Sequence, residues 1–152
     1  MYYTPDKLHK YGLRDTSSCP RCGLEGAGFA HISWFCHDIQ QLWLSASKAL
    51  TDTTDVMLES SPLPMLLGYV REIPKPCRRL IAVGLVLARR RIAMRWMQRL
   101  LPVLSDWRTD MIYCNTHSDN YRDLMPVTSR STDIWGPFRA YLIRTSDAVT
   151  FQ

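Results

Sequence analysis

Apolar residues recur at helical spacing in three long stretches of the chain. Residues 37–50, 77–101 and 105–121 each carry apolar residues three and four positions apart, which is the period of one face of an α-helix. The three sets are Ile39, Leu42, Trp43, Ala46 and Leu50; Ile81, Leu85, Ala88, Ile92 and Trp96; and Trp107, Met111, Cys114 and Tyr121. We therefore expect three amphipathic helices that pack together through these faces.

Capping residues indicate where further helices begin and end. Thr4 and Pro5 suit the N-cap and first position of a short N-terminal helix. Pro102 is expected to end the long second helix, and Ser105 to cap the next one. A closing helix is expected within 132–143, with the inward side chains Trp135, Phe138 and Leu142.

Three cysteines and one histidine near the N-terminus have the spacing C-x2-C-x8-H-x4-C. Cys19, Cys22, His31 and Cys36 can offer Zn²⁺ four ligands in a tetrahedron, with Gly23 permitting the turn after the close pair. Four protein ligands leave no open position for a substrate or a reactive water, so one structural zinc ion is predicted. The alternative is three buried or oxidised cysteines beside an ordinary core histidine.

The fold class expected from these patterns is mainly α. A small CCHC zinc-bound loop is followed by a bundle of about four to five helices. Pro62 and Pro64 favour an extended connection after the polar residues that precede them. We expect a zinc-knuckle module with flanking helices at 1–50, a linker at 51–64 and a helical C-terminal module at 65–152.

The number of cysteines and the length of the apolar runs indicate the cellular compartment in which we expect the protein. Five cysteines, an odd number with Cys77 and Cys114 in unrelated contexts, suit reduced thiols better than a disulfide framework. The longest apolar run, Leu80 to Ala88, is too short to cross a bilayer, and no signal peptide is recognisable. We expect a soluble intracellular protein of the cytoplasm or nucleus, with no membrane partner. The oligomeric state is not predicted.

Arginine dominates the positive charge of the chain. The formal net charge is +5, from 19 Lys and Arg against 14 Asp and Glu, and only four of the 19 are lysine. Arginine suits phosphate and flat bases, although an excess of this size is common in proteins that bind no nucleic acid. Arg91, Arg95 and Arg99 follow one edge of the predicted long helix, whereas Arg90 shares the opposite edge with Arg79. The pattern is equally compatible with arginines that bind a nucleic-acid backbone and with arginines that form intramolecular ion pairs.

The metal motif and its surroundings resemble the zinc-binding region at the C-terminal end of non-LTR (LINE-type) retrotransposon reverse transcriptases. The matching residues around the site are Cys19, Cys22, His31, Ile32, Trp34, Cys36, Ile39, Leu42 and Trp43. The similarity extends to residues 3–9, 66–69, 88–96, 102–107, 121 and 135–138, which is nearly the whole chain. His37 departs from the pattern, because the family commonly has proline there, and it could compete as a ligand.

The resemblance implies an accessory region that binds template RNA or single-stranded DNA beside the remainder of a reverse transcriptase. The residues expected to contact nucleic acid are Arg21, Trp34, Arg89, Arg91, Arg95 and Arg99. Trp34 and Phe35 lie between the last two predicted ligands, and burial of one of them over the site is favoured over exposure for base stacking.

The chain is not expected to be an enzyme. It has no phosphate loop, nucleophile elbow or paired acid motif, and it lacks the polymerase and endonuclease motifs of the family. A structural element that packs on a polymerase, and a non-functional retroelement remnant, are the alternatives to nucleic-acid binding.

Overall fold

The computed structural model describes residues 3–69, 73–122 and 133–149, and within them every regular element is a helix. One short π-helix, η1, spans His31–Phe35 and follows the loop that carries the first two cysteines. The α-helices are α1 (Pro5–Lys10), α2 (His37–Thr54), α3 (Pro62–Leu67), α4 (Lys75–Arg95), α5 (Leu104–Arg122) and α6 (Gly136–Val149). The mainly α fold predicted from the sequence is therefore confirmed: a CCHC group near the N-terminus is followed by several packed helices.

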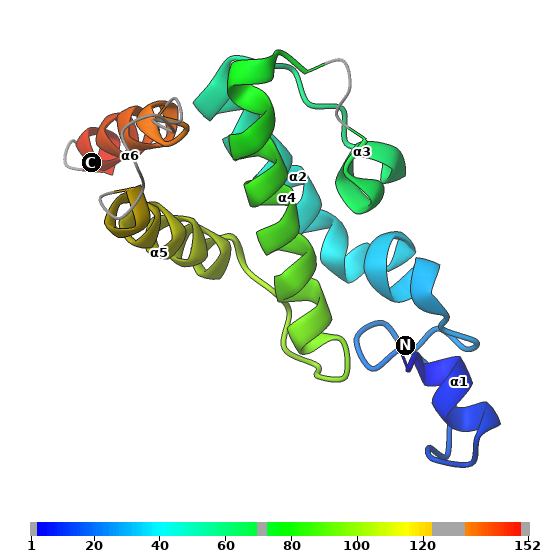
Figure 1. Cartoon of the computed structure of the whole chain (residues 1–152). Coiled ribbons are helices and arrows are strands. Elements are labelled where there is room, and N and C mark those ends of the chain that lie inside the picture. The colour runs from blue at the N-terminus through cyan, green and yellow to red at the C-terminus, as the bar shows by residue number, and fades with distance from the viewer. Residues whose placement is uncertain (1–2, 70–72, 123–132, 150–152) are drawn as a thin grey trace.

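Helix α2 forms where the first apolar stripe predicts a helix. Its stripe residues are all buried: Ile39, Leu42, Trp43, Ala46 and Leu50. The helix continues four residues past Leu50 to Thr54, and the capping residue Asp55 has a φ of 55°, in the left-handed region that commonly closes helices. The segment between α1 and η1, which carries Cys19 and Cys22, is called the metal loop below. Figure 1 shows α2 running from the side of this loop into the middle of the molecule beside α4.

Helix α4 is the central element of the bundle. It contacts α2, α5, α3 and η1, and its stripe residues Ile81, Leu85, Ala88 and Ile92 are buried. Gly84 of α4 lies against side chains of both α2 and α5. The indole of Trp107 on α5 donates a 2.8 Å hydrogen bond to the Gly84 carbonyl, and a Cβ atom at Gly84 would lie 2.7 Å from the Leu50 Cδ2 atom.

Two connections differ from the sequence expectation. Residues Pro62–Leu67 form helix α3 instead of an extended segment, with both prolines inside its first turn. Amide groups in a first helical turn have no partner within the helix, so proline is tolerated there. Helix α4 ends at Arg95 rather than near Pro102, because the chain turns at once: Gln98 N–H donates to the Arg95 carbonyl.

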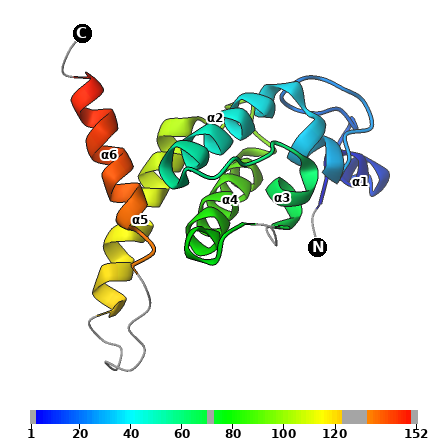
Figure 2. The same ribbon diagram turned by 90° about the horizontal axis from the view of Figure 1, so that it is seen from above.

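The buried side chains form one cluster that joins the metal loop to the C-terminal helices. It runs from Cys19 and Ile32, through the faces of α2 and α4, to Trp107 on α5 and Tyr141 on α6. Figure 2 shows α6 extending from one end of this bundle and the metal loop with α1 at the opposite end. Residues 126–131 and the side chain of Tyr121 lie outside the described residues. None of the described helices is long and apolar enough to cross a membrane.

Close packing around Gly84 gives a testable prediction. Gly84→Val should lower the free energy of unfolding by about 1–3 kcal/mol, the usual cost of overpacking a core. The added atoms would meet Leu50 and Trp107. Thermal unfolding followed by circular dichroism measures the change, with Val86→Ala on the exposed face of the same helix as the control. Gly84→Val and Leu50→Ala should compensate each other in a double-mutant cycle; additive effects would contradict the contact.

Candidate metal centre

The four predicted ligands come from three consecutive segments of the chain. Cys19 and Cys22 lie on the loop after α1, His31 begins η1, and Cys36 lies between η1 and α2. Gly23 N–H donates a 2.9 Å hydrogen bond to the Cys19 carbonyl, and Gly23 adopts a φ of +78°. Glycine is the residue that takes this conformation without strain, so the loop can turn both thiols toward the same point.

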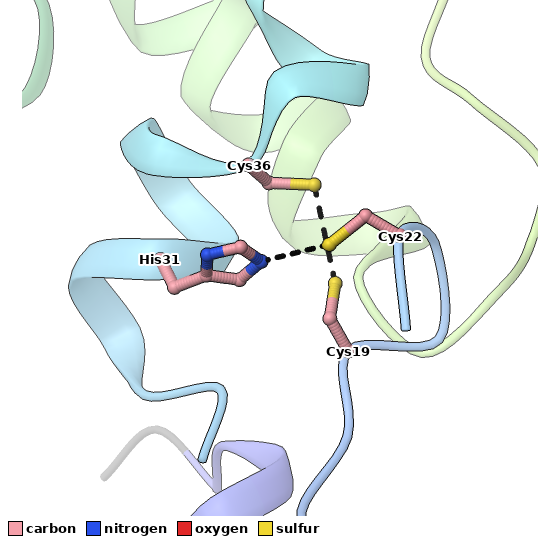
Figure 3. A group of neighbouring side chains, drawn as sticks. All are labelled: Cys19, Cys22, His31 and Cys36. Carbon is pink, nitrogen blue, oxygen red and sulfur yellow. Dashed lines mark hydrogen bonds between the residues drawn. The ribbon is translucent and has the colours of Figure 1, made fainter. Parts of the chain in front are cut away.

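The ligand atoms of this CCHC group all lie within 4.8 Å of one another. Figure 3 shows the three sulfurs and the imidazole of His31 directed toward a common centre. The Cys19 and Cys36 sulfurs are 3.9 Å apart, and the Cys22 sulfur is 3.2 Å from His31 Nε2. Adjacent thiolates around a tetrahedral zinc ion lie about 3.8 Å apart, from metal–sulfur distances of about 2.3 Å. The donor set and its spacing therefore fit a four-coordinate metal ion.

The protonation behaviour differs among the candidate ligands. Burial, with a smaller contribution from the charge of Cys19, raises the pKa of Cys36 to about 12. Burial also opposes ionisation of Cys19, but hydrogen bonds from the backbone at Cys22 and Arg21 lower its pKa below the ordinary value. Burial and the nearby charge of Arg21 lower the pKa of His31, which favours the neutral imidazole that acts as a ligand. Metal uptake must release thiol protons here, so affinity rises with pH.

His37 does not belong to the ligand group. Its side chain is 78% exposed, and its Nε2 atom lies 2.9 Å from a carboxylate oxygen of Asp38. It is the first residue of α2 and is absent from the cluster of possible ligands. The group of residues that could hold a metal ion therefore consists of the four that the spacing predicts, and His37 is not part of it.

Trp34 is buried rather than presented for stacking. Only 8% of its surface is exposed, and its ring packs on Trp43 with the ring centroids 5.6 Å apart. Trp43 in turn donates a 3.0 Å hydrogen bond from its indole nitrogen to the Ser33 carbonyl. Phe35, the other aromatic residue between the last two ligands, is 67% exposed. Of these two aromatic residues, Trp34 thus packs into the core against Trp43, and Phe35 is exposed.

Arg21 is half-buried and engaged within the protein, although the sequence suggested a contact with nucleic acid. Its two terminal nitrogens donate to the carbonyls of Ile32 on η1 and Ile92 on α4, at 2.9 and 3.0 Å. Burial lowers the pKa of this guanidinium, and the nearby Cys36 and Cys19 sulfurs oppose that shift.

Two arginines of α4, Arg91 and Arg95, form ion pairs with aspartates of α5. Arg91 makes a bidentate pair with Asp110 of α5, at 2.5 and 2.6 Å, and this hydrogen bonding raises the pKa of Arg91. Arg95 lies 2.8 Å from Asp106 on the same helix. Of the two interpretations that the sequence left open, intramolecular pairing is the one observed for these two arginines.

Arg89 and Arg99, the other two arginines expected near the C-terminal half of this helix, do not form a row of phosphate-binding side chains either. Arg89 donates to the carbonyls of Leu66 and Leu85, at 2.7 and 3.2 Å, and so ties α3 to α4. Arg99 is exposed but lies in the turn after α4, because the helix ends at Arg95. Arg91, Arg95 and Arg99 therefore do not form one exposed helical edge.

The opposite edge of α4 carries the exposed charge. Lys75 and Arg79 are exposed, and Arg90 has a half-exposed side chain whose nearest carboxylate oxygen, on Asp110, is 3.5 Å away. An open groove of about 570 Å³ follows the same edge, and its lining residues are Val86, Arg89, Arg90, Ala93 and Met94. The helical spacing of Arg79 and Arg90 could have identified this edge; the sequence did not say which edge faces solvent.

A scan against protein-family models found no match, and searches of curated proteins and of solved structures also found none.

Removing one ligand should abolish metal uptake. Wild-type protein is expected to carry one metal ion per chain in native mass spectrometry, and Cys22→Ser is expected to carry none, because three donors cannot close the site. Cys77→Ser is the matched control, since that half-buried thiol lies on α4 outside the CCHC group. His37→Ala should retain the metal. Full metal loading of Cys22→Ser would contradict the assignment.

Proposed function

We propose that the chain is a zinc-stabilised, nucleic-acid-binding accessory region of a non-LTR retrotransposon reverse transcriptase, without a catalytic centre of its own. The observation that carries the proposal is the convergence of Cys19, Cys22, His31 and Cys36 within 4.8 Å. The same four residues stand at the positions on which the family resemblance depends. The buried partner Trp43 occupies the position of the family's closing tryptophan.

Zinc acts structurally in this proposal. Three thiolates and one imidazole fill a tetrahedral ion, which leaves no position for a substrate or an activated water. The ion would hold the loop between α1 and η1 against the start of α2. Loop residues 11–30 contribute only two buried hydrophobic side chains, Cys19 and Ala27, so apolar packing alone gives this segment little stability.

The edge of α4 with Lys75, Arg79 and Arg90 is the surface that we assign to nucleic acid. Helix α4 contains no acidic residue, so its exposed cations are not neutralised along the helix itself. Lysine and arginine on one face bind backbone phosphates and release counterions, which makes such binding weaken as salt rises. Arg91 and Arg95, paired with α5, support this face from behind rather than contact the ligand.

A protein partner is the second candidate for the same region. Val86 and Met94 are 52% and 56% exposed and line the groove beside Arg90. Apolar side chains in an open groove are typical of surfaces that bind a protein partner, such as the rest of a polymerase. Binding of that kind would depend on Val86 and Met94 and would change little with salt.

Salt dependence separates the two candidates. Zinc-loaded protein should bind single-stranded RNA or DNA in fluorescence anisotropy, with an affinity that falls as salt rises. Arg79→Gln combined with Arg90→Gln should weaken binding about tenfold and reduce the log–log salt slope by roughly two, one for each lost phosphate contact. Lys7→Gln combined with Lys10→Gln makes the same charge change on exposed α1 residues and should leave binding nearly unchanged. Absence of salt-sensitive binding in the wild type would refute the nucleic-acid proposal.

Zinc removal should unfold the N-terminal part of the chain. A strong chelator is expected to lower the helical circular dichroism signal and to raise amide hydrogen exchange across residues 17–50, because metal binding and folding are coupled in small metal modules. Adding zinc back should restore both signals. Unchanged exchange in residues 17–36 after verified metal loss would show that the ion has no structural role.

A further inference from the structure

We infer that Arg21 couples the metal loop to the C-terminal end of α4, so that the zinc site controls the order of the helix that carries the basic face. The inference rests on the zinc occupancy proposed above. It adds a positioning role for a residue that lies between two ligands but is not one itself.

The side chain of Arg21 spans two elements that are distant in sequence. One terminal nitrogen donates to the Ile32 carbonyl in η1, and the other donates to the Ile92 carbonyl in α4. Ile92 belongs to the last turn of α4, which ends at Arg95. Carbonyls and the negative end of the helix dipole gather in a last turn, so a guanidinium there stabilises the helix end. Arg21 therefore caps α4 from outside the helix.

Apolar packing between η1 and α4 does not fill the space beside this link. A cavity of about 90 Å³ remains between the two elements, and both Ile32 and Ile92 line it together with Trp43 and Trp96. A cavity forfeits the dispersion contacts that its lining would otherwise make. The two hydrogen bonds of Arg21 thus connect η1 to α4 beside a space that the surrounding side chains do not fill.

Because Arg21 lies between two metal ligands in the sequence, a bound ion would restrain the backbone from which its side chain extends to Ile92. Its neighbours in the chain are Pro20 and the ligand Cys22, and Cys19 lies one residue further back. When all ligands hold one ion, the backbone on both sides of Arg21 is restrained, and its long side chain loses little further freedom on binding Ile92. Without the ion, the same loop has few buried contacts to keep the guanidinium in place.

Charge gives Arg21 a second effect on the site. Zinc with three thiolates and a neutral imidazole carries one net negative charge. The half-buried Arg21 guanidinium lies close to the Cys36 and Cys19 sulfurs. A fixed cation beside bound thiolates stabilises the loaded site, in the way that outer-shell partners generally do.

Two substitutions separate these effects. Arg21→Met removes the charge and both hydrogen bonds at similar length, whereas Arg21→Lys keeps the charge but loses the planar fork that reaches two carbonyls. Arg14→Met is the matched control on the same loop, outside the metal group. Zinc affinity is measured by competition with a chromophoric chelator, and amide hydrogen exchange is measured for residues 89–96 in zinc-loaded and zinc-free full-length protein.

The expected results form a pattern. Arg21→Met should weaken zinc binding about 10–100-fold, the usual effect of losing an outer-shell partner. It should also make residues 89–96 exchange as fast in the loaded protein as they do in zinc-free wild type. Arg21→Lys should show the same fast exchange with a smaller loss of zinc affinity. Arg14→Met should match the wild type in both measurements.

Other outcomes overturn the inference. The inference is wrong if Arg21→Met binds zinc within twofold of the wild-type affinity and amide hydrogen exchange at residues 89–96 is unchanged from the zinc-loaded wild type. If Arg21→Met does not fold, Arg21→Lys decides, and wild-type exchange at 89–96 in that variant would refute the coupling. Wild-type protein that binds no zinc would instead refute the proposed function, so the two failures are distinguishable.

Discussion

The N-terminal loop cannot hold its shape by apolar burial, and this constraint governs the rest of the structure. Between α1 and η1 the chain buries few hydrophobic side chains, and two of its residues, Cys19 and Cys22, instead direct their sulfur atoms to one point with His31 and Cys36. Small segments with too little core generally depend on a metal or another covalent or ionic staple. The helices beyond Cys36 have a large shared core, so they supply the platform on which this loop rests.

Charge pairing between α4 and α5 has a similar organising effect on the surface. Asp106 and Asp110 engage Arg95 and Arg91, so the side of α4 next to α5 is held by ion pairs. The exposed positive charge is left on the other edge, with Lys75 and Arg79. The arrangement explains how a helix rich in arginine can offer a basic face on one side only, and it moves the proposed nucleic-acid contact to a surface next to an open groove.

Much of the helical fold follows from local pattern. The apolar stripes of α2 and α4 are buried as the spacing predicts, and Pro5 begins α1 after Thr4. The errors concern helix ends and connections. Proline at 62 and 64 was expected to keep the chain extended, but proline fits the first turn of α3; and α4 stops six residues before its expected end at Leu101 because the chain must turn to bring α5 alongside. Such ends depend on what the next element must contact, which local spacing does not encode.

The sequence alone identified the four residues that the structure brings together as a possible metal site, because the donor chemistry and spacing of Cys19, Cys22, His31 and Cys36 lie within one short segment. It also determined which helix faces are apolar, since a 3.6-residue period can be read directly. Only the tertiary structure decided the partners of the arginines. Arg21 meets Ile92 across 71 positions of the chain and Arg91 meets Asp110 across 19, and the reach of these long side chains depends on how the helices pack. The same packing buries Trp34 against Trp43 and leaves Arg79 exposed to solvent, because burial is a property of neighbouring elements and not of a residue type.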